Sequence, residues 1–188
     1  MNAKDILRQL SQRGLREDEL AEVARRLTSN EGDKYDWLLI LGRSGATQYR
    51  PLVEKFLESP VDPMLARLAV QVLCRYWGLG ESYEDTLVRF AHRVSWDEDD
   101  DVRLMAIDCL GEVLLRKPND KLLGYLFELF ESNQERQIVR EAAYCAMARA
   151  VGTPVSNLPS AARHFDLAKD TDQAVIDTVM DRILRSQS

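Results

Sequence analysis

The sequence predicts an all-α protein, a right-handed α-solenoid of about four to five antiparallel helix pairs. One apolar pattern, with its residues four positions apart, recurs at intervals of 37 residues. Its copies are Leu65, Ala69, Leu73; Val102, Ala106, Leu110; Val139, Ala143, Met147; and Ile176, Met180, Leu184. Around each copy, apolar residues follow the roughly 3.6-residue period of an α-helix. A fixed period of this length is typical of stacked helical repeats, whose curved surfaces usually bind other macromolecules.

The second helix of each expected pair carries the clearer apolar stripe. We expect these helices at 62–77, 99–115 and 135–151. Asp62 can cap the first of them, and Pro63 suits its first helical position. First helices are expected before them at 49–59, 83–95 and 119–132, and the last of these is apolar on nearly all sides.

The two ends of the chain follow the repeat less closely. Shorter helices are expected at 3–12, 17–29, 33–42, 160–168 and 173–185. We therefore expect a single domain over 1–188, because no low-complexity linker divides the chain. Its predicted parts are a degenerate N-terminal cap and first repeat at 1–42, central repeats at 49–78, 83–116 and 119–152, and a degenerate last repeat at 157–186.

Composition and cysteine usage favour a soluble cytoplasmic protein. Hydrophobic residues make up 45% and charged residues 30% of the 188 positions, which is ordinary for a globular chain. No apolar run reaches the roughly 20 residues of a membrane span, and the first residues do not form a secretory signal. Cys74, Cys109 and Cys145 lack paired spacing, so we expect reduced thiols rather than a disulfide framework or a zinc site.

The charge distribution argues against nucleic acid and anionic membranes as partners. Residues 1–94 hold 14 basic and 14 acidic side chains, whereas residues 95–188 hold 11 basic and 17 acidic ones. Phosphate backbones and anionic lipids both prefer a basic surface. We therefore expect the partner to be another protein, with a basic surface.

One segment carries a recognisable repeat signature. Residues Asp100 to Gly111 read Asp-x-Val-Arg-x-x-Ala-x-x-x-Leu-Gly, and Val139, Arg140 and Ala143 repeat its centre. Over about residues 17–186 the chain resembles the HEAT-like repeats of the armadillo/HEAT superfamily. The resemblance implies that Arg103 and Arg140 pair with an aspartate of a neighbouring repeat, and it implies no single function because these repeats serve many tasks.

An acidic run precedes the helix expected at 99–115. It consists of Asp97, Glu98, Asp99, Asp100 and Asp101. Two acids would satisfy a helix N-terminus, and five in succession repel one another. We therefore predict that Asp97, Glu98 and Asp99 dock a basic partner surface. Solubility and a bound metal such as calcium are the alternatives, although the calcium-loop pattern is absent.

A second candidate surface lies along the second helices, at positions that the repeat register should expose. Its predicted contact residues are Arg75, Asp108, Glu112, Glu141, Arg149 and, beside them, Tyr144. The mixed polarity of this ridge suits a protein partner better than a phosphate backbone. An ordinary solvated face is the alternative reading.

No catalytic, cofactor or metal motif stands out in the sequence. His92 and His164 are far apart and lack a neighbouring nucleophile or metal-ligand spacing. We therefore predict a non-enzymatic protein-binding scaffold, for example an inhibitor or immunity protein that occludes a basic effector. The alternative is a HEAT-like enzyme acting on nucleic acid, such as an alkylated-base DNA glycosylase, which the acidic balance disfavours.

Overall fold

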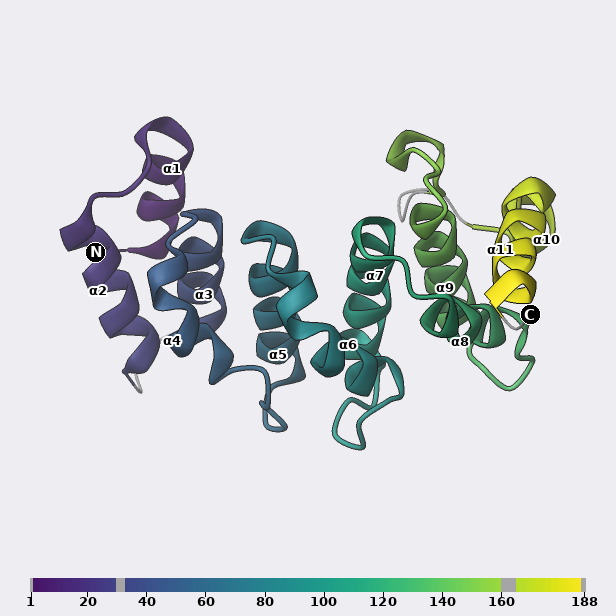
Figure 1. Ribbon diagram of the computed structural model, residues 1–188. Helices are drawn as coiled ribbons and strands as arrows, with labels where there is room; N and C mark the ends of the chain where they lie inside the picture. Colours follow the sequence, from purple (N-terminus) through teal and green to yellow (C-terminus); the bar gives the residue numbers. More distant parts are fainter. Residues whose placement is uncertain (1, 30–32, 160–164, 187–188) are drawn as a thin grey trace. The chain divides into compact units, whose positions relative to one another are not determined.

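The computed structural model describes residues 2–29, 33–159 and 165–186, and every regular element in these ranges is a helix (Figure 1). The predicted all-α class is therefore confirmed. None of the helices in the described ranges is long and apolar enough to cross a membrane. The antiparallel solenoid arrangement stays a prediction.

The chain forms two compact units, and each is described by itself. The first comprises Met1–Leu79 and Val94–Met105, and the second comprises Gly80–Arg93 and Ala106–Ser188. The division falls within helix α7 (Asp101–Arg116). The prediction of one repeat domain over 1–188 concerns how these units are joined, and it stays a prediction.

In the first unit, helix α3 is the central element, because it packs against α1, α2 and α5. The elements are α1 (Ala3–Arg13), α2 (Glu17–Thr28), α3 (Lys34–Arg43), the 3₁₀ turn η1 (Thr47–Tyr49), α4 (Arg50–Glu54), α5 (Pro63–Gln71) and the π-helical turn η2 (Val72–Tyr76). Asp62 caps α5 as expected, since its Oδ1 accepts from the Met64 amide at 3.1 Å. The helix expected at 49–59 ends early at Glu54, where short i→i+3 turns lead toward Pro60.

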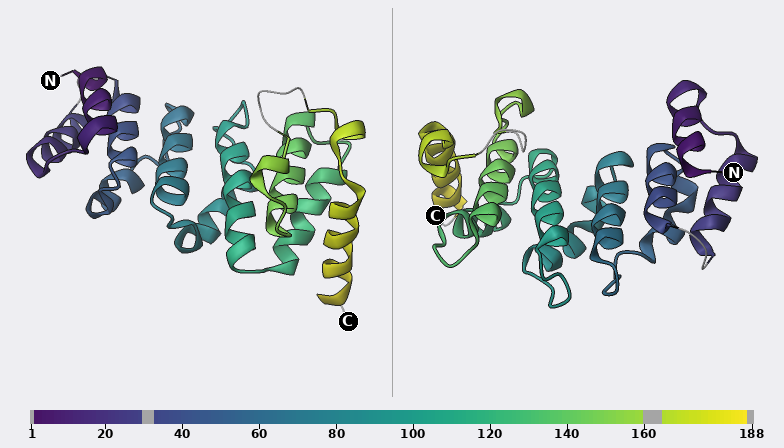
Figure 2. Two further views of the ribbon diagram at one scale, coloured as in Figure 1. Left: turned by 90° about the horizontal axis from the view of Figure 1, so that it is seen from above. Right: turned by 180° about the vertical axis from the view of Figure 1, so that it is seen from behind.

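In the second unit, α8 packs against both α9 and α11, shown in green and yellow in Figure 2. The elements are η3 (Gly80–Tyr83), α6 (Glu84–Ala91), the part of α7 from Ala106, α8 (Asp120–Glu131), α9 (Gln137–Ala150), η4 (Val155–Asn157), α10 (Leu167–Asp170) and α11 (Gln173–Ser186). The helix expected at 83–95 stops at Ala91, and Arg93 follows with a left-handed φ of 72°. Much of the helix expected at 160–168 lies outside the described residues.

The structure buries all residues of the recurring apolar pattern in three of its four copies. All residues of the copies that begin at Leu65, Val102 and Val139 are buried. The fourth copy is wrong, because Met180 is 42% and Leu184 58% exposed. Helix α11 packs chiefly on α8 and buries another face, formed by Val175, Ile176 and Val179.

Two helix glycines mark points where helices cross closely. In the second unit, a Cβ added to Gly111 would lie 2.7 Å from the Cα of Ala146, so α7 and α9 meet there backbone to backbone. In the first unit, a Cβ added to Gly42 would lie 2.3 Å from Cγ2 of Val72. At both positions a larger residue would push the neighbouring element away.

Candidate functional site

Part of the acidic run is buried and stabilises the start of helix α7. Asp97 is only 1% exposed, and its Oδ2 accepts from the Arg103 amide at 2.9 Å in the first turn of α7. Asp100 is buried too, with a left-handed φ of 64°, and its carboxylate lies 3.7 Å from Nη1 of Arg103. The Asp97 side chain therefore caps a helix and is withdrawn from solvent, so it does not belong to an exposed docking surface; partner binding at this run stays a prediction.

Glu98 and Asp99, the other two residues predicted to dock a partner here, are exposed. The described ranges contain no group of three His, Cys, Asp or Glu side chains that could hold a metal ion. Of the three residues predicted to dock a partner, Glu98 and Asp99 are the exposed ones, and their contact with a partner stays a prediction.

Arg149, predicted on the exposed ridge, is buried between α9 and α7. Its Nη1 donates at 2.8 Å to the Asp108 carboxylate and at 2.8 Å to the Asp108 carbonyl. The predicted exposure of Arg149 is wrong because the two helices approach closely at Gly111, so this position faces the neighbouring helix. The structure does bring Arg149 and Asp108 together, as a polar link within the fold.

Tyr144 is also buried, so its side chain does not lie on an exposed surface as predicted. Its hydroxyl accepts from the Asp172 amide at 2.8 Å, and its ring stacks on Phe165 at 5.6 Å. Burial raises the pKa of this phenol. Tyr144 thus ties the segment before α11 to helix α9.

The remaining predicted ridge residues lie at or near the surface. Glu112 and Glu141 are half-buried, and Glu141 accepts from Gln137 Nε2 at 2.8 Å. Arg75 is exposed and belongs to the first unit. Beside this ridge, burial raises the pKa of the Cys145 thiol to about 11, which keeps it protonated and poorly nucleophilic. All three cysteines are free.

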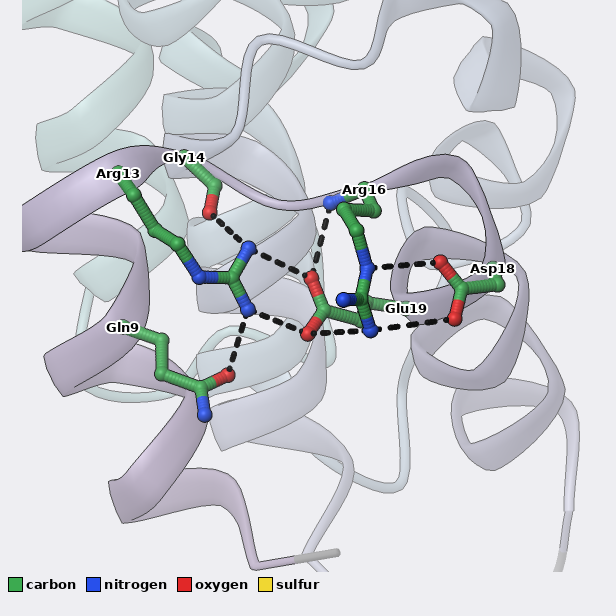
Figure 3. Close-up of polar contacts among 6 residues, drawn as sticks. All are labelled: Gln9, Arg13, Gly14, Arg16, Asp18 and Glu19. Atoms are coloured by element: carbon green, nitrogen blue, oxygen red, sulfur yellow. Dashed lines mark hydrogen bonds and ion pairs between the residues drawn. The ribbon is translucent and has the colours of Figure 1, made fainter.

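In the first unit, a cluster of charged side chains joins α1 to α2 (Figure 3). The Glu19 carboxylate accepts hydrogen bonds from both terminal nitrogens of Arg13, at 3.0 and 2.5 Å, and from the Arg16 amide at 2.9 Å. The Arg13 hydrogen bond is the main reason that the pKa of Glu19 falls to about 2. Because these groups satisfy one another, we interpret the cluster as a clasp between helices.

A groove of about 950 Å³ in the second unit is lined by other residues than those predicted. Helix α6 contributes Glu84 and Val88, α8 contributes the largest share, and α11 contributes Ile183 and Ser186. The remaining lining residues are His92, Asn119, Asp120, Lys121, Leu122, Gly124, Tyr125, Phe127 and Glu128.

Hydrogen bonds fix the side of this groove that lies between α6 and α8. The Glu84 carboxylate accepts hydrogen bonds from Lys117 Nζ at 3.0 Å and from Asn119 Nδ2 at 3.4 Å. The hydrogen bond between Lys117 and Glu84 raises the pKa of Lys117. The Tyr125 hydroxyl donates to the Ala91 carbonyl at 2.8 Å, and the His92 ring packs 4.2 Å from the Tyr125 ring. These contacts hold the wall in one geometry.

Along α8, the groove follows the positions Asp120, Gly124 and Glu128, which are one helical turn apart. Asp120 Oδ1 accepts from Arg182 of α11 through Nε at 3.0 Å and Nη2 at 2.7 Å. Glu128 is exposed, and a Cβ added to Gly124 would meet no atom within 4 Å. The groove thus combines apolar side chains with carboxylates, which suits an apolar surface flanked by cations.

Comparisons of this chain with protein-family models, curated proteins and solved structures gave no match. The resemblance to HEAT-like repeats therefore rests on the residues of the chain itself. Sequence reasoning missed the groove. The signal that could have indicated it is Gly124, a glycine in the middle of an otherwise strongly apolar helix.

Proposed function

We propose that this chain is a protein-binding module and that it holds its partner in the groove of the second unit. The observation that carries the proposal is the composition of the groove. Half-buried apolar side chains of Val88, Phe127 and Ile183 lie beside the carboxylates of Asp120 and Glu128. Apolar contact area ringed by polar groups is typical of protein interfaces.

A protein partner accounts for this groove better than a nucleic acid does. Phosphate backbones are bound by clustered lysine and arginine side chains, which neutralise them. The groove is lined by three carboxylates, and Lys121 is the one lysine or arginine among its lining residues. No observation on the groove favours the DNA glycosylase alternative. An inhibitor that occludes a basic effector would suit this lining, and we keep that role as the finer version of the proposal.

We also propose that the helices form a HEAT-like solenoid. The buried 37-residue register in three copies supports this arrangement. So do Gly42 and Gly111, which follow corresponding leucines and permit close helix crossings within their own units. The three free thiols support a reducing, cytoplasmic setting.

Affinity capture with matched baits tests the protein-binding role. The baits are the full chain, a Gly124→Gln variant that fills the groove, and a Glu131→Gln variant altered at an exposed position of α8 that does not line it. We expect a protein that the unaltered chain and Glu131→Gln retain and Gly124→Gln loses. Retention of nucleic acid instead, released by about 0.2 M salt, would contradict the proposal.

A further inference from the structure

We propose that the groove of the second unit accepts an amphipathic helix of the partner protein, which crosses α8 at Gly124 and carries cationic side chains on both sides of its apolar face. This inference rests on the proposed protein-binding function and adds the chemistry of the partner segment to it.

Two glycines inside the described α-helices, Gly42 and Gly111, lie where another helical element packs closely. Gly42 faces Val72 within the first unit, and Gly111 faces Ala146 within the second. Gly124 is also within a helix, yet a Cβ there would meet no atom within 4 Å. A glycine weakens a helix interior relative to alanine, so helix propensity does not account for glycine at this position.

The open space over Gly124 belongs to the groove. Small residues allow helix axes to approach at the near end of the roughly 8–10 Å range of packed helices. At Gly42 and Gly111 that space is taken by a neighbouring helical element. A helix supplied by another protein would occupy the corresponding space at Gly124.

Acidic side chains on α8 lie on either side of this crossing point. Asp120 and Glu128 are each four residues from Gly124, which is about 6 Å along the helix axis. Oδ1 of Asp120 accepts both hydrogen bonds from Arg182, and within the described residues neither Oδ2 of Asp120 nor the Glu128 carboxylate accepts a hydrogen bond. A helix that crosses between them would therefore meet carboxylate oxygens on both flanks.

Apolar side chains from three helices provide the rest of the contact. Val88 of α6, Phe127 of α8 and Ile183 of α11 line the groove and are half-buried. The partner helix would bury its apolar face against them and place lysine or arginine side chains at Asp120 and Glu128. This is the helix-in-groove mode of recognition, with charge setting the orientation.

The test uses fluorescein-labelled peptides of about 18 residues, long enough to form a helix when bound. One peptide carries a leucine face flanked by lysines, and its control has glutamate in place of every lysine. Fluorescence anisotropy at low salt measures both against the full chain and against Gly124→Gln, Glu128→Gln and Glu131→Gln. Thermal melts accompany each variant, and Gly124→Gln should fold because no atom obstructs the added side chain.

We expect the lysine peptide to bind at least about tenfold more tightly than the glutamate peptide. Gly124→Gln should weaken it at least about tenfold, Glu128→Gln about two- to fivefold with a flatter salt dependence, and Glu131→Gln not at all. Equal binding of both peptides, or binding that ignores Gly124→Gln, would overturn the inference. So would a homodimer in sedimentation that Gly124→Gln dissolves, since a second copy would then fill the groove.

The outcome of the capture experiment separates this inference from the proposed function. A protein captured through the groove, together with failure of the lysine peptide, would leave the binding function standing and refute the basic helix. Absence of any protein that depends on Gly124 would refute both.

Discussion

A glycine-to-alanine pair within the second unit tests the packing argument most directly. Gly111 lies in α7 and Gly124 in α8, both inside helices, so alanine gains about 0.5–1 kcal/mol of helix propensity at either position. Their surroundings differ. The added Cβ would lie 2.7 Å from Ala146 Cα and 2.8 Å from its carbonyl oxygen at Gly111, but would contact nothing within 4 Å at Gly124.

The sign of the effect should therefore be opposite at the two positions. At Gly111, backbone atoms are in the way, so α7 and α9 must separate by several tenths of an ångström before ordinary contact is restored. Overpacking of this kind costs about 1–3 kcal/mol, and separation also stretches the Arg149–Asp108 hydrogen bonds. We expect Gly111→Ala to destabilise by about 1–2 kcal/mol and Gly124→Ala to stabilise by about 0.5–1 kcal/mol.

Urea unfolding followed by far-UV circular dichroism measures both changes. The expected difference between the two variants is about 1.5–3 kcal/mol, well above the error of comparing midpoints at a common m-value. Two variants of equal stability, or a stabilised Gly111→Ala, would show that α7 and α9 do not meet at this glycine. A destabilised Gly124→Ala would show that α8 needs glycine for its own fold, which would also remove the basis of the groove inference.

Three further substitutions test the assignments of individual polar side chains. Asp97→Ala should destabilise the protein by about 1 kcal/mol, because the cap of α7 is lost. The control Glu98→Ala should change the stability by less than about 0.5 kcal/mol. Equal urea midpoints for the two variants would contradict the capping role of Asp97. Tyr144→Phe should cost about 1 kcal/mol and speed amide exchange at Asp172, and unchanged exchange would count against that hydrogen bond. Because the folded pKa of Glu19 is lowered to about 2 from 4.5, its contribution is present above pH 4.5 and lost toward pH 2, so Glu19→Gln should flatten the acid side of the pH–stability profile.

The helices could be predicted from the sequence because their signals are local. Asp62 caps a helix at the position that the pattern indicated, and the apolar stripe gave the buried residues in three copies of the pattern. The fourth copy failed because the burial of Met180 and Leu184 depends on which helix α11 packs against. That choice involves contacts with α8, which are distant in the sequence, and includes the Arg182–Asp120 pair.

The candidate contact residues were harder to predict, for reasons that differ from residue to residue. Arg149 is buried because Asp108, 41 positions earlier, supplies its hydrogen-bond acceptors. Asp97 caps a helix from six residues before Arg103, which requires the left-handed turn at Asp100. The apolar periodicity predicts neither the burial of Arg149 nor the capping by Asp97, because both depend on how separate segments meet.

Taken together, these positions explain why the function is better sought on α8 than on the second helices. Side chains that looked most available in the sequence, such as Arg149, Tyr144 and Asp97, stabilise the fold and would lose that role if a partner drew them away. Gly124 and Glu128 show the reverse pattern, because no described contact accounts for the glycine, and the exposed carboxylate has no ion-pair partner among the described residues. Groups whose chemistry the fold leaves unused are the ones that a partner can engage without first breaking the protein's own bonds.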